Sequence, residues 1–115
     1  MPLNDTLLNV GANAMAAVAT HLALHTAQPD ASGSNQAASA RVAASWPGAS
    51  TGDLSITNKA FTGGAANGAC THVGFWSQLA AGGTFYGYVA LTGDQTFNAA
   101  GEYTITSLAV NGSST

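Results

Sequence analysis

Apolar residues near the start of the chain recur at steps of three and four positions. The residues in this series are Leu3, Leu7, Val10, Ala14 and Val18. Such spacing puts side chains on one face of a helix, so the pattern predicts a helical arm within residues 1–20. Asn4 or Asp5 can cap its start, because a short side-chain oxygen accepts from the free amides of a first turn. Since Gly11 and Asn13 weaken a helix, we expect it to be short and to lean on a sheet.

The rest of the chain alternates with a period of about two between clusters of Gly, Ser, Asn and Pro, a pattern that predicts strands. The predicted strands span residues 21–26, 41–46, 54–61, 70–77, 84–91, 95–97 and 102–110. Two of them, within residues 70–91, flank a glycine-bearing turn and predict a hairpin. Several short strands with turns between them are typical of a small antiparallel β-sandwich or barrel. We therefore expect a single mainly β domain over residues 1–115.

Two stretches depart from regular alternation. Residues 27–40 contain no large apolar side chain and predict a long exposed loop, a kind of segment that is commonly functional or mobile. In the last predicted strand the apolar residues change phase between Ile105 and Leu108, which predicts a bulge near Ser107.

The three histidines raise the question of a metal site. In a strand, His21 and His25 lie on the same side but about 13 Å apart, too far to share one ion. If residues 19–25 were helical, the two would be adjacent and His72 could add a third ligand. No nearby carboxylate supplies a supporting hydrogen bond. The strand pattern therefore favours half-exposed polar residues, and we predict no metal site.

Charge changes the picture more than any single motif. Only 6% of the residues are charged, with two basic and five acidic side chains and a formal net charge of −3, whereas an ordinary domain carries about 25%. Nucleic-acid affinity rests on neutralising phosphates with Lys and Arg, so the chain is not expected to bind nucleic acid or an anionic membrane. Much of the apolar fraction is alanine, so we expect a thin core that neighbouring subunits help to complete.

Candidate catalytic groups are few. Cys70 and His72 alternate along a strand and could form a nucleophile and its base, but no residue that orients the imidazole can be named, which favours a buried thiol. The five acids are scattered, at Asp5, Asp30, Asp53, Asp94 and Glu102. No glycine-rich phosphate-binding spacing occurs. We predict no catalytic residue, no enzyme activity and no cofactor.

Four aromatic residues remain as candidates for a contact surface: Trp46, Trp76, Tyr86 and Tyr88. Tyr86 and Tyr88 are expected on one face of their strand, where a phenol can bury its ring and keep its hydroxyl wet. Three interpretations stay open for these aromatics: core filling, an interface between subunits, and a platform for a ligand such as a sugar.

Four strings of residues carry a family resemblance. They are LALHTAQPDASG at 22–33, GACTHVGFWS at 68–77, GGTFYGYVALT at 82–92 and QTFNAAGEYTI at 95–105. Together they resemble small tail-fibre-like or minor tail proteins, or head decoration proteins, of tailed bacteriophages of the actinobacteriophage type.

The resemblance implies a non-enzymatic structural protein of the virion, made in the host cytoplasm. The implied partners are further copies of the chain, with a trimer favoured, and capsid or tail proteins. The neutral surface, rich in aromatic and Asn residues, supports one alternative, a small carbohydrate-binding β-sandwich for attachment to the host surface.

Overall fold

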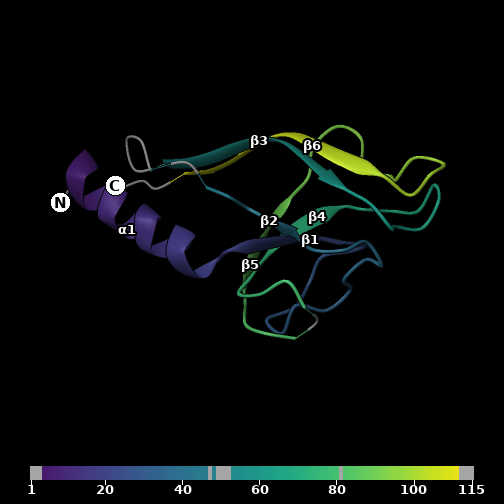
Figure 1. Cartoon of the computed structure of the whole chain (residues 1–115), viewed down its shortest axis with the longest axis horizontal. Helices are drawn as coiled ribbons and strands as arrows, with labels where there is room; N and C mark the ends of the chain where they lie inside the picture. Colours follow the sequence, from purple (N-terminus) through teal and green to yellow (C-terminus); the bar gives the residue numbers. More distant parts are fainter. Residues whose placement is uncertain (1–3, 47, 49–52, 81, 112–115) are drawn as a thin grey trace.

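Two antiparallel sheets face each other, and one helix extends from their end (Figure 1). The computed structural model describes residues 4–46, 48, 53–80 and 82–111. The first sheet has the strand order β2-β1-β4-β5, and the second pairs β3 with β6. In chain order the elements are α1 (Asp5–Val18), β1 (His21–His25), β2 (Val42–Ala43), β3 (Asp53–Phe61), β4 (His72–Trp76), β5 (Phe85–Ala90) and β6 (Tyr103–Asn111). The predicted mainly β sandwich with a short N-terminal helix is confirmed.

Period-two alternation locates five of the strands closely, and the predictions at 41–46 and 95–97 differ most from the structure. Of the predicted strand at 41–46, only Val42–Ala43 pairs with β1, and the left-handed Ser45, with φ 49°, then turns the chain. The predicted strand at 95–97 is reduced to one bridge between Ala69 and Thr96. The predicted hairpin is confirmed, since β4 and β5 pair antiparallel.

The core lies between the two sheets and is made of side chains from both. Its buried members are Leu22, Leu24, Ala37, Ala44, Ile56, Phe61, Cys70, Val73, Leu91, Phe97, Ile105 and Leu108. Nine of these twelve are Leu, Ile, Val or Phe, so larger side chains fill this interior although the chain is rich in alanine. Burial of this apolar area from water is the main term that stabilises the sandwich.

The change of phase in β6 is present, but no extra residue produces it. β6 pairs with β3 in one constant register along its whole length. The pairing is interrupted at Asn58, whose φ of 54° is left-handed. Both strands shift phase together there, so that Ile56 and Leu108 are buried on one side of the interruption and Ile105 on the other. The predicted bulge near Ser107 is therefore wrong.

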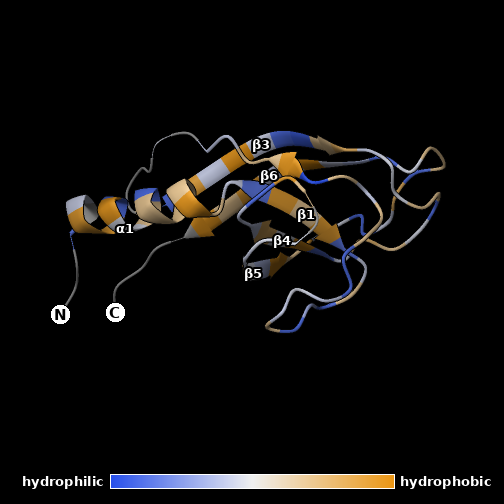
Figure 2. Cartoon of the chain, turned by 60° about the horizontal axis from the view of Figure 1, so that its bottom comes forward, coloured by the Kyte–Doolittle hydropathy of each residue, from blue (hydrophilic) through white to orange (hydrophobic). Residues whose placement is uncertain are grey.

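Helix α1 begins where the sequence indicates, because the Asn4 side chain accepts a hydrogen bond from the Leu7 amide at 2.9 Å. Its contact with the body is made toward β3. Ala12, in the middle of the helix, and Ala19, its C-cap, are buried. The short alanine side chains let the helix lie close to the strands. Beyond this contact, α1 projects from the end of the sandwich, nearly in line with β1 (Figures 1 and 2).

The apolar series that predicts the helix does not face the sheet. Leu7 is 53% exposed, Val10 62% and Val18 47%, while Leu3 lies outside the described residues. The helix is thus as expected in extent, but its larger apolar side chains point into solvent. Figure 2 shows hydrophobic segments along the projecting helix.

The segment 27–40 is irregular, as predicted, but it is only partly exposed. Its buried residues are Pro29, Gly33, Ala37 and Ser39. Backbone hydrogen bonds from Ala37 to Leu24 and from Thr26 to Asn35 hold it against β1. Because this segment covers the second face of β1, His25 is fully buried, and the expectation of a half-exposed His25 is wrong.

Candidate functional sites

A buried cluster of polar and aromatic side chains lies on the outer face of the four-stranded sheet, under segment 27–40. His25 Nδ1 lies 2.8 Å from the Ser34 carbonyl oxygen, which can only accept, so Nδ1 carries the proton. The Trp76 indole N–H points to His25 Nε2 at 3.4 Å, and the two rings stack with centroids 6.2 Å apart. Gly74 lies directly beneath the imidazole, and a Cβ at this position would clash with Nε2. These contacts select the neutral imidazole.

The environment of His25 also opposes its protonation. Burial lowers the pKa of His25 below its ordinary value, and the nearby His72 and Arg41 act in the same direction, whereas the hydrogen bond to Ser34 opposes them. A proton on Nε2 would remove the acceptor of the Trp76 indole. His25 is therefore a packing element of this cluster.

Arg41 holds the turn between β4 and β5 from inside the protein. Its Nη1 donates to the carbonyl oxygens of Gln78, Ala80 and Gly82 at 3.0, 2.9 and 2.8 Å, and Nη2 donates to Gln36 at 3.0 Å. The guanidinium carbon lies 3.9 Å from the centre of the Trp76 ring, a cation–π contact. Sequence reasoning missed this role, although a lone cation in an alanine-rich segment was a usable signal.

The four predicted contact aromatics do not form one surface. Trp76 is buried in the His25 cluster. Tyr88 is exposed and meets His72 edge to face, with ring centroids 5.4 Å apart. Trp46 and Tyr86 come together elsewhere, in a groove at the base of α1.

The pairing of β5 with β4 is irregular beside Tyr86. The register of β4 with β5 shifts between Phe75 and Trp76, and Gly87 opposite has φ 145°. Phe85 therefore packs on His25 and Trp76, while Tyr86 lines the groove beside Phe75. Tyr86 and Tyr88 are both exposed and line one hollow beside residues 29–31, so the shift does not separate them.

The groove at the base of α1 has a volume of about 210 Å³. Its lining is almost wholly apolar: Met15, Val18, Ala19, Trp46, Leu54, Phe75, Tyr86 and Val110. The Trp46 indole donates to the Ala19 carbonyl oxygen at 2.8 Å and so satisfies a free carbonyl at the helix end. Trp46 also packs on Phe75, with ring centroids 6.1 Å apart. This one side chain fixes where the helix leaves the body and shapes the groove.

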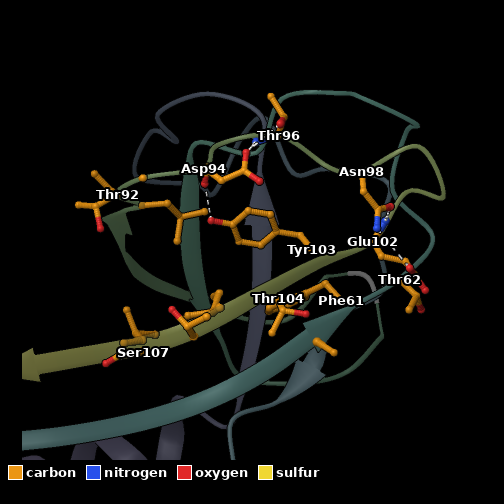
Figure 3. A pocket seen from close by; sticks show the side chains of 17 residues that line it. Phe61, Thr62, Thr92, Asp94, Thr96, Asn98, Glu102, Tyr103, Thr104 and Ser107 are labelled. Atoms are coloured by element: carbon orange, nitrogen blue, oxygen red, sulfur yellow. Dashed lines mark hydrogen bonds between the residues drawn. The ribbon is translucent and has the colours of Figure 1, made fainter.

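A second, larger hollow of about 650 Å³ lies between the end of β5 and β6 (Figure 3). β5 and β6 are the outer strands of their sheets, so each has a free edge on this side within the described chain. The buried Phe61, Leu91 and Ile105 are among its lining residues. Polar lining residues surround them, namely Thr62, Thr92, Asp94, Thr96, Asn98, Glu102, Thr104, Thr106 and Ser107. We refer to this hollow as the β5–β6 cleft.

Hydrogen bonds hold the polar side of the cleft in shape. The Tyr103 hydroxyl donates to the Asp94 carbonyl oxygen at 2.6 Å, and its ring lies across the cleft (Figure 3). The Asp94 carboxylate accepts from the backbone and hydroxyl of Thr96, and the Glu102 carboxylate accepts from the Asn98 amide at 3.3 Å. Burial raises the pKa of Tyr103, with smaller contributions from Cys70 and Asp94. The cleft therefore presents hydroxyl, amide and carboxylate groups beside one neutral phenol.

Cys70 is a buried thiol, as the sequence favours. Burial raises its pKa to about 11, and Asp94 adds to the shift, so the reactive thiolate is disfavoured. The His72 ring nitrogen Nδ1 is occupied elsewhere, by the Thr71 hydroxyl at 2.7 Å.

Within the described ranges, no three His, Cys, Asp or Glu side chains are placed to hold a metal ion. The part of the chain that the structure describes also contains no helix with the length and hydropathy needed to span a membrane.

Comparison with known proteins assigns the family. No curated protein and no solved structure matches the chain. A family model described as podophage GP4 fiber I protein gp80 matches residues 3–113, nearly the whole chain. The chain therefore belongs to the family of podophage GP4 fiber I protein gp80, a family of phage fibre proteins.

Proposed function

We propose that this protein is a non-enzymatic structural unit of a tailed-phage virion that works through symmetric contacts with its own copies and with tail or capsid proteins. The observation that carries the proposal is the fibre-family match over residues 3–113. A neutral surface supports it, because copies of a chain with 6% charged residues can pack closely with little repulsion. A trimer of copies, synthesised in the host cytoplasm and assembled into a tail fibre or minor tail part, is the form we favour.

Mass spectrometry of purified phage particles tests this function. We expect peptides of the chain in the particles at a few to tens of copies, the stoichiometry of a tail part. Hundreds of copies per particle would instead support capsid decoration. Absence of the protein from washed particles would overturn the proposal.

The β5–β6 cleft favours a second candidate function, binding of a neutral carbohydrate on the host surface. Sugars are bound by hydroxyl, amide and carboxylate groups beside an aromatic ring, and Asp94, Asn98 and Tyr103 bring these groups together. Calorimetric titration with host cell-wall glycans tests it. Thr104→Lys places a long cation in the cleft and should abolish binding, whereas Ser55→Lys, at an exposed position of the same sheet outside the cleft lining, should not. Equal binding by the two variants, or no binding by the wild type, would exclude this candidate.

A further inference from the structure

The helix that projects from the body presents an apolar stripe that nothing in the described chain covers. Leu7, Val10, Met15 and Val18 are 53%, 62%, 46% and 47% exposed. Isolated exposed apolar residues need no explanation, but a contiguous apolar surface marks an interaction site. Leu7, Val10, Ala14 and Val18 follow steps of three and four, the spacing of helices that pack side by side.

The stripe runs directly into the groove at the base of the helix. Met15 and Val18 belong to both, and the groove adds the aromatic side chains of Trp46, Phe75 and Tyr86. Exposed large side chains on a helix and an apolar groove beside them form one continuous surface. We call this combined surface the α1 face.

The α1 face has no charge. None of the residues of the stripe or of the groove lining is Asp, Glu, Lys or Arg. A partner of opposite charge would gain nothing from such a surface. A second copy of the same face, by contrast, meets it without repulsion and buries apolar area on both sides.

We propose that the α1 faces of two or more copies of this chain bind each other, so that the stripe and the groove of each copy are covered by its neighbour. This inference rests on the proposed function, and it names the surface through which the copies meet.

The size of the α1 face sets the expected strength of the contact. A helix of 14 residues is about 21 Å long, so a side-by-side contact about 10 Å wide buries about 200 Å² on each copy. Stable interfaces bury about 800 Å² per partner. The helix alone is therefore far smaller than a stable interface, so we expect the contact to include the groove and to remain weak. We expect a reversible association that depends on protein concentration.

Sedimentation velocity of the full chain over a wide concentration range tests the proposal. The wild type should form a defined oligomer, and the double variant Leu7→Gln with Val10→Gln should raise the dissociation constant at least about tenfold. Leu79→Gln is the matched control, because Leu79 is exposed to the same 62% as Val10 but lies in the β4–β5 turn. A monomeric wild type at every concentration, or equal weakening by Leu79→Gln, would overturn the proposal.

Cross-linking provides a second measurement that does not depend on weakened association. Val10 lies near the middle of α1, so Val10→Cys should form a disulfide between copies upon mild oxidation, whereas Leu79→Cys should not. The native Cys70 is buried and does not compete. Absence of the Val10→Cys cross-link also overturns the proposal. If the protein is found in purified particles while these experiments fail, the α1 face is wrong and the virion function stands.

Discussion

The two ends of β1 differ in which side chains are buried: polar groups are buried at one end, and apolar groups are exposed at the other. At the end of the strand, His25 and the nearby Arg41 are polar and buried, and the chain itself satisfies most of their hydrogen bonds. Before its start, α1 carries Leu7 and Val10, which are apolar and exposed. Around His25 and Arg41 the chain supplies the hydrogen-bond partners of its own buried polar groups. On α1 it leaves apolar side chains exposed, where a neighbouring molecule can cover them. If the proposed contact between copies forms, stability and self-association depend on different regions, and the following substitutions separate them.

Arg41→Ala should give the largest loss of stability. The substitution removes four hydrogen bonds and leaves three carbonyl oxygens of the β4–β5 turn without their donor, which we expect to cost about 3 kcal/mol of unfolding free energy. Urea denaturation monitored by circular dichroism measures it. Lys59→Ala, which removes the other basic residue, should cost less than about 1 kcal/mol. Equal costs for the two variants would show that the buried guanidinium does not hold the turn.

Gly33→Ala should lower the unfolding free energy by about 2 kcal/mol, because Gly33 lies in segment 27–40, which covers the cluster of His25 and Trp76. Gly33 has φ 81°, and a Cβ there would lie 2.6 Å from the Trp76 ring. Gly93→Ala is matched in backbone conformation, with φ 75°, but no atom lies within 4 Å of its Cβ, so we expect about 1 kcal/mol. The difference between the two variants in thermal denaturation isolates the contact with Trp76. If both lose the same stability, segment 27–40 does not press on the indole.

Acid should weaken the buried cluster through His25. Its pKa is lowered in the folded protein by burial, so the unfolded chain binds the proton more readily. The contribution of His25 to stability is therefore complete above about pH 6.5 and is lost as the pH falls toward the lowered value of the folded state. His25→Gln should flatten the dependence of the denaturation midpoint on pH in this range, whereas His21→Gln, on the same strand, controls for the loss of a histidine. An unchanged slope in His25→Gln would contradict the assignment.

Val10→Gln should have the smallest effect on the single chain. The side chain is 62% exposed and Gln favours a helix slightly more than Val, so the unfolding free energy of the monomer should change by less than about 0.5 kcal/mol. Chemical denaturation at a concentration low enough to dissociate any oligomer measures it. A loss above about 1 kcal/mol would mean that Val10 belongs to the fold rather than to a surface for assembly.

The sequence predicts the elements of this fold better than their faces. Alternation with a period of two locates β3, β4, β5 and β6 because each has a face toward the core. It does not reveal the register shift beside Gly87, which places Phe85 against His25 and Trp76 while Val89 packs against the core. It fails for His25, because a distant loop covers a face that would otherwise be exposed.

The candidate surfaces were predicted in part. Trp46 and Tyr86 were identified as aromatic candidates, and both line the groove of the α1 face. The orientation of α1 is not predictable from the sequence. A helix with large apolar residues on one face and alanines on another can pack against the body with either face. Here the body takes the alanines Ala12 and Ala19, which permit close approach, and the larger residues remain outside.

The direct passage from α1 into β1 has a mechanical consequence. Only Ala19 and Thr20 separate the two elements, and β1 lies between β2 and β4 with five residues paired to β4. Hydrogen bonds of an antiparallel ladder run perpendicular to the strands, so a pull along the helix axis loads the rungs on both sides of β1 in shear, all at once. Force applied to α1 is thus carried by a central strand of the sheet. An edge strand, by contrast, could lose its hydrogen bonds one after another. A fibre subunit held by its helix would extend only when the hydrogen bonds on both sides of β1 break together.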